Sequence, residues 1–269
     1  MQRVLITGAA GRIGSVLRAG LRGAYPALRL SDIAPLGAAE AGEELCPADL
    51  RDFAAVERTM AGVDAVVHLG GVPEEDAWEP IHEVNIVGCY HVFEAARRHG
   101  VKRVVFASSN HVIGYYRRAR RIGPDAPPRP DGRYGVSKLF GEGLGRLYAD
   151  KHGIGCVALR IGSFQPEPKN VRMLSTWISH RDTVQLVRRA LDAPDVHFEV
   201  VYGVSANARA WWDNPGAARI GYEPRDDAED FAGEILAQQS PEDEPETERL
   251  FHGGPFCAME FTGDTSDIE

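Results

Sequence analysis

Short runs of apolar and β-branched residues alternate with segments of helical spacing along the first part of the chain. The apolar runs predict strands at residues 3–7, 28–33, 65–69, 103–108 and 156–161. In the segments between them, apolar residues recur every three or four positions. These segments predict helices at residues 12–22, 53–61, 81–99 and 134–152. The alternation is typical of βαβ units, and the strands are apolar throughout, so we expect an α/β fold whose parallel sheet is covered on both faces.

The pattern loosens beyond Gly162. It predicts a helix near residues 182–191, a strand near 198–202 and a helix near 228–237. Residues 123–132 are dense in turn-forming residues and predict a surface loop, and the acidic segment 241–246 predicts a solvated connector. We therefore divide the chain into a sheet region, 1–162, and a smaller covering region with the acidic segment, 163–269, packed together as one unit.

Composition and charge exclude several classes of protein. Hydrophobic residues make up 43% of the 269 residues and the formal net charge is −9, which allows a sizeable core and disfavours nonspecific binding to nucleic acid or anionic membranes. Four widely spaced cysteines predict reduced thiols and no metal site: Cys46, Cys89, Cys156 and Cys257. No apolar run is long enough to span a bilayer and no signal sequence is evident, so we expect a cytoplasmic protein.

A glycine-rich turn follows the first predicted strand and opens the first helix. Gly8, Gly11 and Gly14 allow a sharp turn and a close approach of pyrophosphate to the backbone, and Arg12 and Ile13 lie between them. Tight glycine turns also occur in other strand-to-helix connections, but the strand, turn and helix in this order favour a dinucleotide site. The sequence therefore predicts a Rossmann-type, doubly wound parallel sheet.

Asp32 lies at the end of the second predicted strand, about 20 residues after the turn. A carboxylate at this position accepts hydrogen bonds from both ribose hydroxyls of NAD and repels the 2′-phosphate of NADP. No arginine follows it closely to compensate. Asp32 thus favours NAD, and the alternative is an aspartate that only caps a turn.

Tyr134 and Lys138 lie four residues apart in a predicted helix, which places both side chains on one face. A nearby ammonium group stabilises phenolate, so we expect Lys138 to lower the pKa of Tyr134 and allow it to accept a proton from a substrate hydroxyl. Ser109, at the carboxyl end of the fourth predicted strand, can orient the same hydroxyl. A surface tyrosine beside a solvated lysine is the alternative, and the position of Ser109 argues against it.

Taken in order, these motifs resemble the extended short-chain dehydrogenase/reductase superfamily over about residues 1–175. The resemblance includes the stretches GAAGRIG, HLGG and YGVSK. It implies that Tyr134 and Lys138 contact the cofactor as well as the substrate. It implies further cofactor contacts at Asp49, Leu50, Leu69, Gly70, Gly71 and Asn85.

Longer stretches are similar to those of the bacterial uronate dehydrogenases. They are FASSNHVIGYY, RPDGRYGVSK, RIGSFQPEPKN, RMLSTWISH and SANARAWWDN. The resemblance implies NAD-dependent oxidation of the C1 hydroxyl of a cyclic hexuronic acid, D-glucuronate or D-galacturonate, to an aldarolactone. It implies Tyr134 as proton acceptor and Phe164 beside the nicotinamide. The substrate contacts that it implies are Ser109, Asn110, His111, Ser163 and Arg172.

Arg172 agrees with this expectation on physical grounds, because a guanidinium binds a carboxylate with two directed hydrogen bonds. One departure is Pro73, which replaces a hydroxyl or backbone donor common in relatives. We also expect a homo-oligomer.

Two other readings stay open at this point. A nucleotide-sugar epimerase or reductase would use the same cofactor site and tyrosine–lysine pair, although the region after Gly162 is short for binding a nucleotide diphosphate. A nonenzymatic, NAD-sensing regulator could retain the fold, although the intact Tyr134, Lys138 and Ser109 argue against it. The acidic composition and the lack of a basic stripe make DNA binding the least favoured function.

Overall fold

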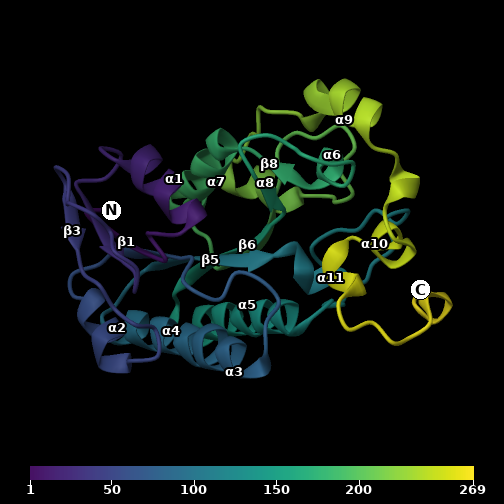
Figure 1. Cartoon of the computed structure of the whole chain (residues 1–269). Coiled ribbons are helices and arrows are strands. Elements are labelled where there is room, and N and C mark those ends of the chain that lie inside the picture. The colour runs from purple at the N-terminus through teal and green to yellow at the C-terminus, as the bar shows by residue number, and fades with distance from the viewer.

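Seven parallel strands form the central sheet of the computed structural model, in the order β3-β2-β1-β4-β5-β6-β9 (Figure 1). The structure describes residues 1–269 apart from the side chain of Pro241. The strands are β1 (Arg3–Thr7), β2 (Ala27–Ser31), β3 (Glu43–Leu45), β4 (Ala65–His68), β5 (Arg103–Ser109), β6 (Gly155–Ile161) and β9 (Phe198–Gly203). This order confirms the predicted Rossmann-type, doubly wound sheet.

Helices cover both faces of the sheet (Figure 1). On one face α1 (Arg12–Leu21) packs against α7 (His180–Asp192), and on the other α2 (Phe53–Thr59), α4 (Gly88–Arg98) and α5 (Arg133–His152) lie side by side. Each layer has its own apolar core, because the buried strand residues point alternately to the two faces.

The smaller elements lie mainly beyond the carboxyl ends of the strands. They are α3 (Trp78–Pro80), β7 (Ser163–Phe164), α6 (Met173–Thr176), β8 (Trp177–Ile178), α8 (Pro215–Ile220), α9 (Ala232–Gln238), α10 (Glu246–Leu250) and α11 (Pro255–Ala258). No helix among the described residues is long and apolar enough to cross a membrane.

Two predicted boundaries differ from the structure in ways that affect the site. The predicted single helix at 81–99 is divided into a π-helical segment, η1 (Ile81–Val87), and the regular helix α4. The predicted strand 28–33 ends at Ser31, so Asp32 lies in the loop after β2. A sequence period near 3.6 does not distinguish a π segment from a regular helix, because the pitch changes over too few residues.

The covering region predicted for 163–269 also contributes to the sheet layers. β9 pairs with β6 and completes the edge of the sheet, and α7 packs on the same face as α1. The remainder of the region, including α6 and α11, lies beyond the carboxyl ends of β5 and β6 (Figure 1). Residue 162 therefore marks a boundary along the sequence, while segments from both sides of it contribute to the sheet and to the helices on one of its faces.

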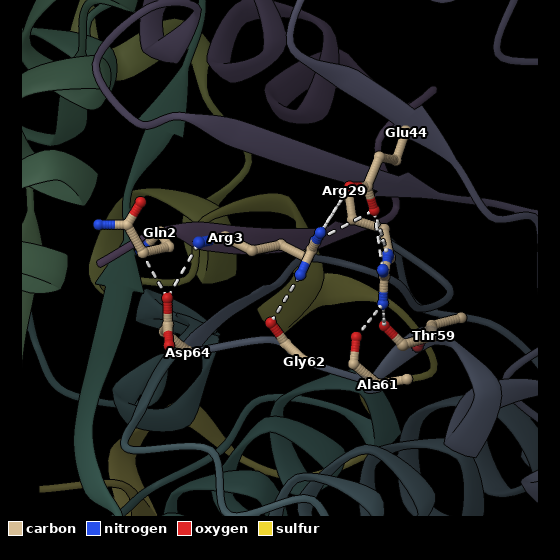
Figure 2. A network of polar contacts seen from close by, with 8 residues as sticks. All are labelled: Gln2, Arg3, Arg29, Glu44, Thr59, Ala61, Gly62 and Asp64. Carbon is tan, nitrogen blue, oxygen red and sulfur yellow. Dashed lines mark hydrogen bonds and ion pairs between the residues drawn. The ribbon is translucent and has the colours of Figure 1, made fainter.

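A cluster of ion pairs fastens the amino-terminal side of the sheet (Figure 2). Arg3 of β1 and Arg29 of β2 both bind the carboxylate of Glu44 in β3, each through Nε at 3.0 Å. These hydrogen bonds hold the pKa of Glu44 below its usual value, with the bond from Arg3 contributing most. Asp64 accepts the backbone N–H of Arg3 at 2.9 Å. The short edge strand β3 is thus held by side chains as well as by its ladder, on the side away from the glycine turn.

A buried ion pair fixes α5 to the centre of the sheet. Glu142 of α5 accepts two hydrogen bonds from Arg160 of β6, at 2.9 Å each, and one from the Ser108 hydroxyl of β5 at 2.6 Å. Both charged side chains are less than one-tenth exposed. Removal of one partner would leave the other charge buried and unpaired, which is energetically costly. The contact therefore fixes the position of α5 on β5 and β6.

We predict that Glu142→Ala lowers the free energy of unfolding by about 3–5 kcal/mol, because the Arg160 guanidinium stays buried without a counter-ion. Urea denaturation of the variant measures this change. Asp150→Ala is the matched control on the same helix, since Asp150 forms an exposed pair with Arg146, and its loss should stay within about 1 kcal/mol. Similar losses for the two variants would show that the buried pair has no special role.

Candidate active site

The glycine turn between β1 and α1 is shaped for a close backbone approach. Gly8 has a φ of +69°, and a Cβ there would lie 2.7 Å from the nitrogen of Gly70. A Cβ on Gly14 would overlap the carbonyl of Gly8. Gly11 caps α1 without any side-chain hydrogen bond, so the first N–H groups of the helix stay available for an anion. These observations fit the pyrophosphate of a dinucleotide.

Asp32 lies directly beside this turn. Its Oδ2 accepts the backbone N–H of Ala10 and its Oδ1 accepts that of Ala34, both at 2.9 Å. Each carboxylate oxygen keeps a lone pair for a further donor. The carboxylate is thus fixed at the edge of the turn, where a ribose attached to the pyrophosphate would meet it.

The loop after β4 contacts the glycine turn at Gly70, and the region next to these two segments is here called the cofactor cleft. Asn85 in η1 accepts the N–H of Val72 at 2.7 Å and donates to the Ser137 hydroxyl of α5 at 3.1 Å. It therefore links the loop of Leu69, Gly70 and Gly71 to the catalytic helix. The wide π turn carries this buried residue, as such turns often do at functional sites.

The other predicted cofactor residues lie around this cleft, and their side chains differ in burial and in hydrogen bonding. Leu50 is buried and would touch a Cβ on Gly70 at 2.8 Å. The carboxylate of Asp49 is bound by Arg51 at 2.7 Å, a hydrogen bond that lowers its pKa. Ile13 packs against the core below the turn, and Arg12 donates to the carbonyl of Phe164 at 3.1 Å. Residues 152 positions apart thus meet across the cleft.

The predicted catalytic residues come together at the carboxyl end of β5. Ser109 ends this strand, Tyr134 lies in the first turn of α5 and Lys138 follows one turn later. The Lys138 ammonium lies 5.4 Å from the centre of the Tyr134 ring and 3.9 Å from the position of a Cβ on Gly71. The ammonium therefore stands between the tyrosine and the wall of the cofactor cleft.

Electrostatics in this cluster differ from the sequence-based expectation that Lys138 lowers the pKa of Tyr134. Burial raises the pKa of Tyr134 to about 12, while the hydrogen bond with Ser109 lowers it and the charges of Asp131 and Glu74 raise it further. Burial also lowers the pKa of Lys138 to about 8. The pKa of Tyr134 is thus shifted in the direction opposite to the expectation, because desolvation disfavours phenolate more strongly than the hydrogen bond with Ser109 favours it.

Arg172, just before α6, is a partly buried cation whose guanidinium is held by neutral groups. It donates to the carbonyl of His252 at 3.0 and 2.7 Å and to the Ser163 hydroxyl at 3.2 Å. With the amide of Asn110 oriented so that both of its polar atoms find partners, its oxygen accepts a hydrogen bond from Nη2 of Arg172 at 2.9 Å and its nitrogen donates to the carbonyl of Ile161. Burial lowers the pKa of Arg172 to about 10. Among the described residues, no carboxylate lies within ion-pair distance of it.

His111 is the next residue in the chain after Asn110. Its Nδ1 lies 2.7 Å from a carboxylate oxygen of Asp131, and its ring stacks on Phe256 of α11 with the centroids 3.9 Å apart. The edge of the ring faces Tyr134. The structure thus brings all five predicted substrate residues to the same end of the sheet as Tyr134.

Several residues of the site were missed from the sequence. Glu75 caps α5 from the loop after β4, since its carboxylate accepts the N–H groups of Arg133 and Tyr134 at 3.0 and 2.8 Å. Asp131, His252 and Phe256 were missed as well. No local pattern marks Glu75, whereas the Gly253-Gly254 pair signals a close approach: a Cβ on Gly254 would lie 2.7 Å from the Arg172 side chain.

Comparison with known proteins identifies the family. Residues 4–200 match the NAD dependent epimerase/dehydratase family. The chain is 51% identical over 257 residues to the uronate dehydrogenase of Pseudomonas putida, covering 95% of each chain. The chain belongs to the uronate dehydrogenases of this family.

Solved structures of uronate dehydrogenases share the fold closely. The Agrobacterium tumefaciens enzyme, solved as a mutant complexed with NAD, has a TM-score of 0.92 at 48% identity, with 96% of this chain and 97% of that chain covered. Glucuronic acid dehydrogenase from Chromohalobacter salexigens has a TM-score of 0.91 at 45% identity, with 99% of each chain covered. The expected superfamily, fold and enzyme class are thereby confirmed, and NAD is the cofactor of this family. The nucleotide-sugar alternative is not favoured.

We predict that Asp32→Ala weakens NAD binding about tenfold and reduces the preference for NAD over NADP, because the ribose hydroxyls lose a charged acceptor. Fluorescence titration with both dinucleotides measures the dissociation constants. Asp243→Ala in the acidic connector is the control, since this exposed carboxylate only caps its own turn. An unchanged ratio of the two constants in Asp32→Ala would remove Asp32 from the ribose site.

Proposed function

We propose that the chain oxidises the C1 hydroxyl of a cyclic hexuronic acid, D-glucuronate or D-galacturonate, to an aldarolactone. When bound, oxidised NAD would accept the hydride that leaves C1 and would bring a positive charge into the site. Ser109 orients the C1 hydroxyl and Tyr134 accepts its proton. Lys138 holds positive charge next to the phenol and the ribose side of the cleft.

The single observation that carries the choice of substrate concerns the guanidinium of Arg172. It has neutral hydrogen-bond partners but no carboxylate as a counter-ion among the described residues. A buried cation without a counter-ion is costly, and a bound carboxylate would remove that cost. Arg172 reaches Ser163 and Asn110, and Asn110 adjoins the catalytic Ser109. A sugar acid meets both requirements, with its carboxylate at Arg172 and a hydroxyl at Tyr134.

The cofactor residues follow from the same arrangement. Gly8, Gly11 and Gly14 would hold the pyrophosphate, with Arg12 and Ile13 beside it, and Asp32 the adenosine ribose. Asp49, Leu50 and the loop from Leu69 to Gly71 would border the adenine side and the centre of the cleft. Asn85 would support that loop, and Phe164 would lie beside the nicotinamide.

Measurement of NAD reduction with a panel of sugars tests the proposal. The panel consists of D-glucuronate, D-galacturonate, the matching neutral aldoses and the corresponding nucleotide sugars. We expect the two uronates to be oxidised with the highest kcat/KM and the nucleotide sugars not at all. Oxidation of the aldoses and uronates with equal efficiency would contradict it, and turnover of the nucleotide sugars would favour the epimerase or reductase alternative.

We further propose that the chain acts as a cytoplasmic homo-oligomer. Supporting the assembly, α5 exposes Val136, Phe140 and Leu147 and the neighbouring α4 exposes Tyr90, each more than one-third accessible. Supporting the compartment, the four cysteines are free thiols. Light scattering of the purified protein measures the assembly, and a monomeric mass would contradict it.

We predict that Arg172→Lys impairs the oxidation of uronates although the charge is preserved. An ammonium has three donors and cannot reproduce the bonds of the guanidinium to His252, Ser163 and Asn110 and also bind a carboxylate. The loss should therefore be on the order of 1 kcal/mol or more. The kcat/KM of the variant is compared with that of the wild type for a uronate and for a neutral aldose. Equal losses for both substrates would remove Arg172 from the carboxylate site.

We predict that Tyr134→Phe retains NAD binding and loses about 10²- to 10⁴-fold in kcat, since the ring remains and the proton acceptor is gone. Dissociation constants from NAD titration and single-turnover rates separate binding from chemistry. Tyr115→Phe is the control, because its hydroxyl bonds only to the carbonyl of Cys257 among the described residues. Near-normal turnover by folded Tyr134→Phe across neutral pH would exclude Tyr134 as the acceptor.

A further inference from the structure

Asp131 is a buried carboxylate that none of the functional assignments above explains. Its side chain is completely shielded from solvent, one oxygen lies 2.7 Å from Nδ1 of His111, and the other has no hydrogen-bond partner. Its backbone N–H donates to the carbonyl of His111 at 3.3 Å. Among the described residues, no arginine or lysine forms an ion pair with it. The oxygen that contacts His111 also accepts a weak hydrogen bond from the buried thiol of Cys257 at 3.8 Å. His111 is therefore the one residue of the predicted substrate site that the Asp131 side chain contacts.

Two glycines from distant parts of the chain form a cradle around this carboxylate. A Cβ on Gly114 or on Gly253 would overlap Oδ2 of Asp131. The cradle is closed by a hydrogen bond of 2.9 Å from the N–H of Gly253 to the carbonyl of Gly114. Any larger residue at either position would displace the carboxylate, so the fold makes room for Asp131 at this point.

The contact with Asp131 favours one tautomer of His111. An ionised carboxylate only accepts hydrogen bonds, so the proton of this contact lies on Nδ1, and the Nε2 of the neutral ring is an acceptor. The ring cannot rotate freely, because it stacks on Phe256 at 17° and meets the edge of Tyr134 at a centroid distance of 5.8 Å.

We propose that Asp131 is a positioning residue that keeps the proton of His111 on Nδ1, so that Nε2 accepts a hydrogen bond from a hydroxyl of the sugar ring. The hydroxyl in question is one that the reaction leaves unchanged, and His111 thereby selects its configuration. This inference rests on the proposed uronate substrate. The position of the proton on the ring of His111 depends only on residues of this chain, so it can be tested without substrate.

The ring of His111 is tested first by ¹⁵N NMR of the imidazole nitrogens in the protein without NAD or substrate, at alkaline pH. We expect a protonated Nδ1 and an unprotonated Nε2 in the wild type. In Asp131→Asn the amide can donate to Nδ1, so we expect the proton to move to Nε2. A wild-type spectrum with the proton on Nε2 would overturn the proposal, and this result needs no variant to fold.

Kinetics then test whether the effect passes through His111. Asp131→Asn should lower kcat/KM for the uronate on the order of tenfold or more, because a matched hydrogen-bonding pair is lost. NAD affinity and the unfolding temperature should stay close to the wild type. Asp76→Asn is the matched control. Asp76 is exposed, and both it and Asp131 belong to the residues that line one cavity of about 640 Å³.

A double-mutant cycle separates positioning from an independent role. In the background of His111→Phe, Asp131→Asn should cause no further loss of kcat/KM. A loss as large as in the wild-type background would show that Asp131 acts on its own and would overturn the proposal. If the wild type oxidised no uronate at all, the proposed function would fail, while the NMR result would still report on the Asp131–His111 pair.

Discussion

The buried carboxylate of Glu142 determines where the chemistry of this protein takes place. It joins α5 to Ser108 and Arg160 on the two neighbouring strands β5 and β6. Ser109 is the next residue of β5, and Tyr134 lies about two helical turns before Glu142 on α5. Because the contact fixes both elements, it also fixes the distance between Ser109 and Tyr134, the residues that we propose to orient the substrate hydroxyl and to accept its proton.

Burial, more than any single charged neighbour, sets the chemistry of the site. It keeps the free phenol of Tyr134 protonated, with a pKa of about 12, and lowers the pKa of Lys138 to about 8. Arg172 has no counter-ion among the described residues, and burial lowers its pKa to about 10. The free protein is therefore in an electrostatic state that ligands can improve: an anion satisfies Arg172, and a positive charge near Tyr134 favours phenolate. Such preorganisation places the cost of burial in folding and leaves its benefit for binding and reaction.

The substrate end of the site is closed by the last part of the chain. The carbonyl of His252 orients the guanidinium of Arg172, the Gly253-Gly254 pair lets the backbone pass the charged side chains, and Phe256 covers His111. These contacts join residues separated by 80 positions or more. The covering region thus acts on recognition by orienting side chains that belong to other elements.

The sequence by itself determined the sheet, the cofactor turn and the tyrosine–lysine pair. Alternating apolar runs reflect burial on both faces of a parallel sheet, and the three glycines and the spacing of Tyr134 and Lys138 are local properties of one turn and one helix. Resemblance to relatives added Asn110, His111, Ser163 and Arg172. Only the tertiary structure decided the cap that Glu75 provides, the π turn at Asn85, the cradle of Asp131 and the direction of the Tyr134 pKa. Burial and contacts between distant segments produce these features, and a local sequence pattern contains no information about which distant groups will exclude water from a side chain.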